Sequence, residues 1–209
     1  GLPVYEPTGC MVVDIGGGTT DVAVISLGGI VISQSIRVGG VKMDEAIINF
    51  IKREFNIQIG DRTAEEVKLD LGAALPLRDV RRARIRGRDL VTTLPQTTEI
   101  TSAQIYEAIR EPCMAILNSI KWVLERTPPE LAADVMHNGI YLTGGGSLLY
   151  GMDQMIASEL GISRQGVHDN LSRTEALLRN MEAKTGCVGR DLACRRAAKT
   201  IQTAANALR

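Results

Sequence analysis

The sequence predicts an α/β protein with an inserted segment, and three observations predict it. Two turns of three consecutive glycines, 16–18 and 144–146, each follow a short apolar run that is typical of a buried strand. A Gly-Gly pair at 28–29 separates two β-branched runs, which is a hairpin signal. Between the hairpin and the second glycine turn, apolar residues are spaced as in amphipathic helices. This order of strands and helices indicates a mixed sheet with flanking helices.

The first glycine turn lies in the run from Asp14 to Asp21. Three glycines in a row bury no side chain and lose more backbone entropy on folding than other residues, so they serve backbone geometry. Their amides can close around an anion such as phosphate, and we expect Gly17 to adopt a positive φ. The second turn, 142–147, also ends a predicted strand. The two turns together suggest a nucleotide held between them.

Oxygen-bearing side chains flank the first turn. Asp14 ends the predicted strand, so we expect its carboxylate to face the pocket of the glycine amides as a direct or water-mediated Mg²⁺ ligand. Thr19 and Thr20 add hydroxyls that can hydrogen-bond phosphate oxygens. The chain has neither the G-x-x-x-x-G-K-[ST] motif nor a G-x-G-x-x-G motif that opens a helix. The predicted site is therefore built on a strand–turn–strand hairpin.

The elements that follow the first turn are a hairpin and two helices. Predicted strands at 22–26 and 31–36 flank a turn at 27–30. Thr63 and Glu66 predict a capping box for the second helix, which runs through Leu71. Helical spacing predicts the first helix, whose apolar residues are Met43, Ala46, Ile47, Phe50, Ile51 and Phe55.

The next elements lead to the second glycine turn. Residues 79–98 are rich in Arg, Thr and β-branched types and are predicted to form a small hairpin with a solvated basic face. Thr101 and Gln104 predict a capping box that opens a long helix. The segment 127–130 is expected to cap a short helix, and Gly139 begins the strand before the second glycine turn.

Composition excludes several classes of function. Lys plus Arg and Asp plus Glu each number 24, and aromatic residues make up 3%, so we expect no nucleic-acid partner. The four cysteines form no C-x-x-C pair and have no histidine nearby in sequence, which favours reduced thiols over a zinc site. No apolar run approaches the roughly 20 residues that span a bilayer, and no signal peptide is visible.

Longer strings around these turns resemble the MreB family of bacterial actins. The hairpin and the second glycine turn are similar to the second phosphate motif and the adenosine motif of the actin, chaperone and sugar-kinase ATPase superfamily. The resemblance runs from about Gly1 to Ile162 and covers the second half of the family's chain. The strings specific to MreB are 6–9, 22–30, 62–68, 87–91 and 125–134.

The resemblance implies an actin-like (ribonuclease H-like) ATPase lobe that binds ATP and Mg²⁺. It implies a large subdomain of residues 1–39 and 99–162 and a smaller inserted subdomain of residues 40–98. It places Mg²⁺ at Asp14 and the ribose and adenine against Glu65 and Lys68, although spacing alone fits an exposed charged pair equally well. The other nucleotide-binding residues it implies are Gly16, Gly17, Gly18, Thr19, Thr20, Gly144, Gly145, Gly146 and Ser147.

For the full-length parent, the resemblance implies an ATPase that polymerises into filaments and guides cell-wall synthesis and rod shape. The filaments would lie in the cytoplasm, at the inner face of the cytoplasmic membrane, with membrane-anchored cell-wall elongation proteins as partners. In the family, the water-orienting acid and the membrane-inserting segment belong to the first half. We therefore expect no catalytic residue in this chain, an inactive chain on its own, and membrane contact only through that first half or through partners.

Two alternatives stay open from the sequence. The chain could be an interaction fragment that works without nucleotide, or another ATPase of the superfamily, although the strings at 62–68 and 125–134 argue against a sugar kinase or a chaperone. Residues 163–209 carry no family motif. They are rich in Arg and Ala and are predicted to form a helical tail of unclear status.

Overall fold

The computed structural model describes residues 4–162. The predicted helical tail, 163–209, lies outside the described residues.

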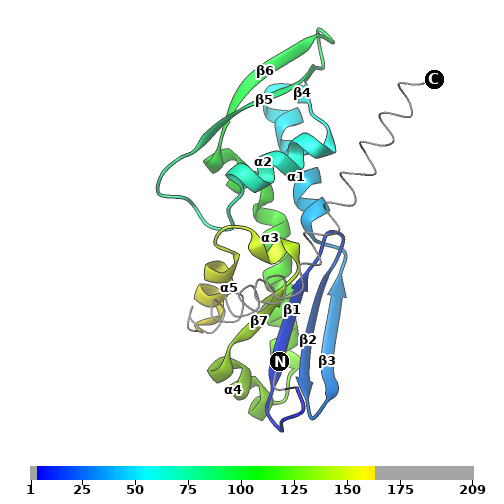
Figure 1. Cartoon of the computed structure of the whole chain (residues 1–209), viewed down its shortest axis with the longest axis vertical. Helices are drawn as coiled ribbons and strands as arrows, with labels where there is room; N and C mark the ends of the chain where they lie inside the picture. The colour runs from blue at the N-terminus through cyan, green and yellow to red at the C-terminus, as the bar shows by residue number, and fades with distance from the viewer. Residues whose placement is uncertain (1–3, 163–209) are drawn as a thin grey trace, which may run out of the picture. The chain divides into compact units, whose positions relative to one another are not determined.

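The first sheet is mixed, as predicted. Its strands are β1 (Cys10–Ile15), β2 (Thr20–Ser26), β3 (Gly29–Ile36) and β7 (Ile140–Thr143), in the order β3-β2-β1-β7. β1 and β2 pair antiparallel, as do β2 and β3, whereas β1 and β7 run parallel (Figure 1). The parallel pairing sets Asp14 at the end of β1 opposite Thr143 at the end of β7. Both glycine turns therefore leave the same edge of the sheet.

The loop between β2 and β3 uses only one glycine of the Gly-Gly pair. Leu27 and Gly28 have φ values of 51° and 74°, and Gly29 already begins β3. Two successive residues with positive φ are typical of the hairpin turn whose twist matches that of the flanking strands. The predicted hairpin is confirmed, and its turn is one residue earlier than the glycine pair suggests.

Helix α1 (Gly40–Phe55) and helix α2 (Asp61–Leu71) follow the first hairpin. The predicted capping box at Thr63 and Glu66 is wrong, because α2 begins at Asp61 with Gly60 as its N-cap and no side-chain cap. The Gly60 carbonyl accepts the Ala64 amide at 3.1 Å, which starts the helix two residues before Thr63. Asp61 in the first turn favours this start, since a carboxylate there interacts with the positive end of the helix dipole.

The second sheet is antiparallel and has the order β4-β5-β6. Its strands are β4 (Ile57–Gln58), β5 (Arg82–Asp89) and β6 (Pro95–Thr101). The predicted hairpin at 79–98 corresponds to β5 and β6, while the two-residue β4 was not predicted. On β5 the side chains of Arg82, Arg84, Arg86 and Arg88 are exposed, which matches the expected solvated basic face.

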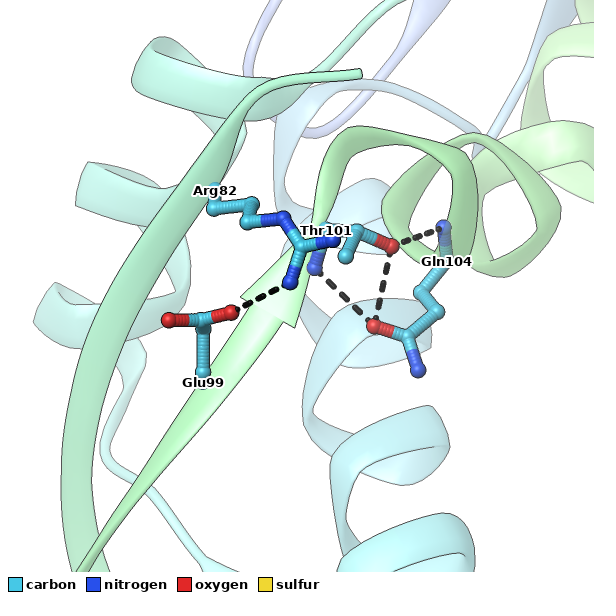
Figure 2. A network of polar contacts seen from close by, with 4 residues as sticks. All are labelled: Arg82, Glu99, Thr101 and Gln104. Carbon is cyan, nitrogen blue, oxygen red and sulfur yellow. Dashed lines mark hydrogen bonds and ion pairs between the residues drawn. The ribbon is translucent and has the colours of Figure 1, made fainter.

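The junction from β6 to helix α3 (Ser102–Arg126) confirms the second predicted capping box. The Thr101 hydroxyl accepts the Gln104 amide at 3.3 Å, and the Gln104 side-chain oxygen accepts the Thr101 amide at 2.9 Å (Figure 2). In the same view, Arg82 forms an ion pair with Glu99 at 2.7 Å, which holds β5 to β6 on the exposed face. This cap fixes where the chain leaves the second sheet and enters α3.

Helix α3 supplies much of the core. Its residues Ile105, Ile109, Ile116 and Ile120 are completely buried, and the helix packs against β2, β3 and α1. Three shorter helices complete the described chain: α4 (Pro129–Asn138), the 3₁₀ helix η1 (Gly145–Leu148) and α5 (Met152–Leu160). Within residues 4–162, no helix combines the length and the apolarity needed to cross a bilayer.

Helix α4 begins within the expected segment, 127–130, but without a side-chain cap. Pro128 is its N-cap. The Thr127 hydroxyl instead donates to the Val123 carbonyl at 2.7 Å and so completes the last turn of α3. Pro129 fits the first position of α4, where a missing amide hydrogen costs nothing.

The second sheet is formed by residues of the predicted insertion, 40–98, except that β6 continues to Thr101. The first sheet is formed entirely by residues outside it. The division into a large subdomain, 1–39 and 99–162, and an inserted one stays a prediction.

Candidate functional site

The first glycine turn, residues 16–19, connects β1 to β2 and packs on the N-terminus of α1. The Gly16 amide donates to the Thr19 carbonyl at 2.9 Å, which closes the turn. The Gly16 and Gly17 carbonyls accept the Gly40 and Val41 amides at 3.0 and 2.8 Å. Two of the unpaired amides that begin any helix are thereby satisfied.

This arrangement directs two amides away from α1. In a planar trans peptide, the amide hydrogen points opposite to the carbonyl of the preceding residue. The amides of Gly17 and Gly18 therefore face away from the helix, and neither donates to any residue among 4–162. Adjacent amides without partners are suited to bind an anion.

The expectation of a positive φ at Gly17 is wrong. The glycines with positive φ are Gly28, Gly139, Gly144, Gly151 and Gly161. A Cβ atom at Gly17 or Gly18 would meet nothing within 4 Å. Open space lies over these two residues, so the fold itself does not require glycine there.

The second glycine turn, residues 144–147, packs against the end of β1. Gly144 has a φ of 81°, and a Cβ atom there would overlap the Ile15 carbonyl and the Asp14 side chain. A Cβ atom at Gly146 would overlap the Ile15 side chain. Ser147 is buried, and its hydroxyl donates to the Gly144 carbonyl at 2.6 Å. Ser147 therefore closes the turn with its own backbone.

Two carboxylates meet where β1 and β2 join. Asp14 and Asp21 are direct cross-strand partners, and both are exposed. The Thr19 hydroxyl donates to Asp21 at 3.1 Å, whereas the buried Thr20 donates its hydroxyl to the Val38 carbonyl at 2.7 Å. Asp21 was not predicted as a site residue; its register opposite Asp14 on the hairpin is the signal that could have found it.

These carboxylates fit a magnesium ion bound together with phosphate. Mg²⁺ takes oxygen ligands, keeps several waters, and is usually held by one or two carboxylates plus substrate phosphates. Asp14 and Asp21 supply carboxylates beside the open amides of the first turn. Within residues 4–162, no group of three or more His, Cys, Asp and Glu side chains could hold a metal ion, so a protein-only metal cage is absent from that part of the chain.

Helix α2 contributes Glu65 and Lys68. Glu65 is exposed, whereas the Lys68 ammonium lies against α1, 2.9 Å from Asp44 and 3.2 Å from the Gly40 carbonyl. Burial raises the pKa of the Asp44 carboxyl, and the neighbouring Lys68 ammonium opposes that rise.

A cavity of about 540 Å³ brings these elements together. It lies within the size range of small-molecule sites. Six of the predicted residues line it: Gly16, Gly17, Glu65, Lys68, Gly145 and Gly146. The other predicted residues belong to the two turns or to the strands beside the first turn and do not line the cavity itself: Asp14, Gly18, Thr19, Thr20, Gly144 and Ser147.

The rest of the wall was not predicted from the sequence. Apolar and aromatic side chains form one part of it, together with Arg81, whose guanidinium lies 6.0 Å from the centre of the Tyr150 ring. A Cβ atom at Gly72 would overlap the Lys68 carbonyl and come to 3.0 Å from Leu149, so the end of α2 requires glycine here. These additional lining residues are Gly40, Met43, Leu69, Gly72, Arg81, Leu148, Leu149 and Tyr150.

A second cavity, of about 580 Å³, lies between α1 and α3. Its lining includes Lys42, Phe50, Glu107 and Pro112, and none of the predicted site residues. The cavity at the glycine turns is therefore the candidate site.

Comparison with known proteins identifies the family and agrees with the fold. The model of the MreB/Mbl protein family matches residues 1–183. Over 162 residues, the chain is 50% identical to the cell shape-determining protein Mbl of Bacillus subtilis and 49% identical to the cell shape-determining protein MreB of Escherichia coli K12. These matches cover 78% of this chain and 49% and 47% of those proteins. The chain thus spans about half the length of the curated relatives it matches.

Solved structures give the same result. The crystal structure of MreB5 of Spiroplasma citri bound to AMPPNP matches with a TM-score of 0.74 and 36% identity, covering 88% of this chain and 57% of that one. A MamK double helical filament matches with a TM-score of 0.56 and 26% identity, covering 72% and 46%. The fold is therefore actin-like, and the chain belongs to the MreB/Mbl family of cell shape-determining proteins.

Proposed function

We propose that this chain is the ATP-binding half of an MreB-type bacterial actin. The observation that carries the proposal is the cavity into which both glycine turns and α2 contribute residues. Its polar wall holds Gly16, Gly17 and Lys68, and its apolar wall holds Leu69, Leu148, Leu149 and Tyr150. A nucleotide has the matching division, with charged phosphates at one end and a largely apolar base at the other.

In this proposal the first glycine turn binds the phosphates. The free amides of Gly17 and Gly18 donate to phosphate oxygens, with the Thr19 hydroxyl beside them, and Thr20 keeps the turn in place through Val38. Asp14 holds Mg²⁺ directly or through water. When bound, the ion neutralises phosphate charge.

The second glycine turn and α2 hold the nucleoside. Gly144, Gly145 and Gly146 pass beneath it, where the absence of side chains permits close approach, and Ser147 closes that turn. Glu65 and Lys68 contact the ribose and adenine from α2, since both side chains line the cavity.

We further propose that the full-length protein assembles into ATP-dependent filaments. They lie in the cytoplasm at the inner face of the membrane and guide cell-wall synthesis with membrane-anchored elongation proteins. The support comes from relatives: two are cell shape-determining proteins, MreB5 has been crystallised with AMPPNP and with ADP, and MamK forms a double helical filament.

The test is a titration of the isotope-labelled 209-residue chain with Mg-ATP, followed by NMR. If the family's first half supplies three charge-assisted hydrogen bonds to phosphate, their absence removes about 4.5–9 kcal/mol, at about 1.5–3 kcal/mol each. A micromolar site then becomes millimolar or weaker. We expect weak, saturable shifts at Gly17, Gly18 and Lys68 and no measurable ATP turnover.

Other outcomes distinguish the proposed ATP-binding site from an interaction fragment that works without nucleotide. Shifts that appear only outside the cavity would contradict the proposed site. A chain that self-associates equally with and without nucleotide, and shows no shifts in the cavity, would favour the interaction fragment instead.

A further inference from the structure

The Lys68 ammonium sits at a junction between the first glycine turn and helices α1 and α2. It donates to the Gly40 carbonyl at 3.2 Å, and the Gly40 amide donates to the Gly16 carbonyl at 3.0 Å. Gly40 thus connects the lysine to the turn proposed to bind phosphate. A Cβ atom at Gly40 would lie 3.3 Å from the ammonium, so the missing side chain leaves room for it.

The third contact of this junction is Asp44, one turn further along α1. Its carboxylate lies 2.9 Å from the Lys68 ammonium, and the two side chains are 15% and 14% exposed. Lys68 lines the cavity, and Asp44 does not. The ion pair therefore joins an ammonium of the cavity wall to a carboxylate outside that wall.

The Asp44–Lys68 ion pair differs from a second ion pair nearby, which lies entirely on α1. Lys42 and Glu45 pair at 2.6 Å with side chains that are 54% and 50% exposed, so they stay solvated. Asp44 is mostly buried, and within residues 4–162 its Oδ1 atom has no hydrogen-bond partner. Burying a carboxylate with one unpaired oxygen stabilises a fold less than an apolar side chain of similar size. Fold stability alone is a poor reason for a carboxylate here.

We infer that Asp44 is a positioning residue of the nucleotide site, which holds the Lys68 ammonium at the cavity wall. Lysine has a flexible four-carbon stem, and an unrestrained ammonium would spread over many rotamers. The carboxylate of Asp44 and the carbonyl of Gly40 hold it in one place before a ligand arrives. Such pre-organisation raises affinity because less side-chain entropy is lost on binding. The inference rests on the proposed function.

The first arm of the test uses the 209-residue chain without nucleotide. The side-chain ammonium of Lys68 is observed by NMR and assigned by its disappearance in Lys68→Met. We expect a signal protected from solvent exchange, its loss in Asp44→Asn, and its retention in the matched control Glu45→Gln. A Lys68 signal that is unprotected, or that Asp44→Asn leaves unchanged, overturns the inference without any reference to nucleotide.

The second arm measures Mg-ATP affinity in the same variants. Initial slopes of chemical-shift change at Gly17 against ligand concentration give the ratios of affinity even without saturation. We expect about tenfold weaker binding in Asp44→Asn, the order of one charge-assisted contact, and unchanged binding in Glu45→Gln. The double variant with Lys68→Met should bind as Lys68→Met alone does, because Asp44 acts only through Lys68.

The outcomes separate the two proposals. Additive losses in the double variant, or full affinity in Asp44→Asn, overturn the inference and leave the proposed function standing. No Mg-ATP-dependent shift at Gly17 in the unaltered chain overturns the proposed function, and the inference with it. If Asp44→Asn does not fold, Asp44→Glu replaces it: the charge stays but moves by one methylene, and we expect a smaller loss of the same two signals.

Discussion

The two glycine turns share a sequence pattern but need glycine for different reasons. In the second turn, a side chain at Gly144 would overlap Asp14 and Ile15, and its φ of 81° disfavours any other residue. In the first turn, a side chain at Gly17 or Gly18 would meet open space at an ordinary φ. In the second turn, the fold requires glycine at residues 144 and 146. The first turn leaves room, which is what an external ligand needs.

The largest expected effect tests the second turn. Gly144→Ala adds strain at positive φ and a clash with the end of β1, so we expect it to lower the free energy of unfolding by about 2–4 kcal/mol. The matched control is Gly145→Ala, whose Cβ atom would meet nothing within 4 Å; we expect a change below about 1 kcal/mol. Urea denaturation measures both. Equal losses would remove the contrast between adjacent glycines.

A large effect on binding, with a small one on stability, is expected in the first turn. Gly17→Val places a branched side chain in the open space over the turn amides, so Mg-ATP binding should fall at least tenfold. The free energy of unfolding should change by less than about 1 kcal/mol, since a Cβ atom at Gly17 would meet nothing within 4 Å. NMR titration and urea denaturation of the same sample check this. A variant that unfolds would mean that the fold, too, requires glycine at residue 17.

Asp14 lies near the end of β1, two residues before the first turn and beside Gly144 of the second turn. We expect Asp14→Ala to weaken Mg-ATP binding and to leave Mg-free ATP binding unchanged, because a hard cation loses an oxygen ligand. Its fold stability should be kept or slightly raised, since the substitution removes a like-charge cross-strand pair with Asp21. Titrations with and without Mg²⁺ measure the first effect. Equal losses in both would remove Asp14 from the metal site. In the full-length parent, nucleotide-dependent sedimentation should disappear.

The smallest effect concerns a turn that closes without glycine. Between β5 and β6, the Asp89 carboxylate accepts the Val91 and Thr92 amides, each at 2.7 Å. The hydrogen bonds from Thr92 and then Val91 lower the pKa of Asp89 below its usual value. Its contribution to stability is therefore present above the unfolded pKa of about 4 and lost as pH falls through the folded pKa.

The measurement is amide hydrogen exchange at Val91 and Thr92 across that acidic range. We expect protection to be lost on acidification in the unaltered chain, after correction for intrinsic exchange. In Asp89→Ala, which removes the accepting oxygen, protection should be low at every pH. Protection that is independent of pH would show that the backbone alone holds this turn.

Much of the fold was predictable because it depends on local patterns. The helical spacing of α1, the capping box of α3 and the β2–β3 hairpin follow from residues within a few positions of one another. The sequence places helix ends less precisely, because several residues near a helix end can cap it. At α2, the N-cap is Gly60, three residues upstream of Thr63. At α4, the threonine hydroxyl bonded backward to α3.

The candidate site was predicted in part for the same reason. Glycine runs and a strand-end aspartate are visible in sequence, and six of the predicted residues line the cavity. Arg81, Leu69 and Tyr150 could not be found this way, because nothing local marks a side chain that completes a wall assembled from distant segments. Asp44 could not be found from the sequence either, because nothing around it distinguishes it from a solvent-exposed acidic residue. Only the packing of α2 against α1 buries it.

By itself, the sequence determined the element types, the family resemblance and the positions of both glycine turns, since each depends on short-range geometry or on motifs read directly. The tertiary structure decided which glycines are forced and which leave space. The parallel pairing of β1 with β7 brings Gly144 against Ile15, while α1 takes the carbonyls of Gly16 and Gly17 and leaves the amides of Gly17 and Gly18 free. Whether a position requires glycine depends on the atoms that a side chain there would contact. Strands and helices that are distant in the sequence supply those atoms, so only the tertiary structure reveals the requirement.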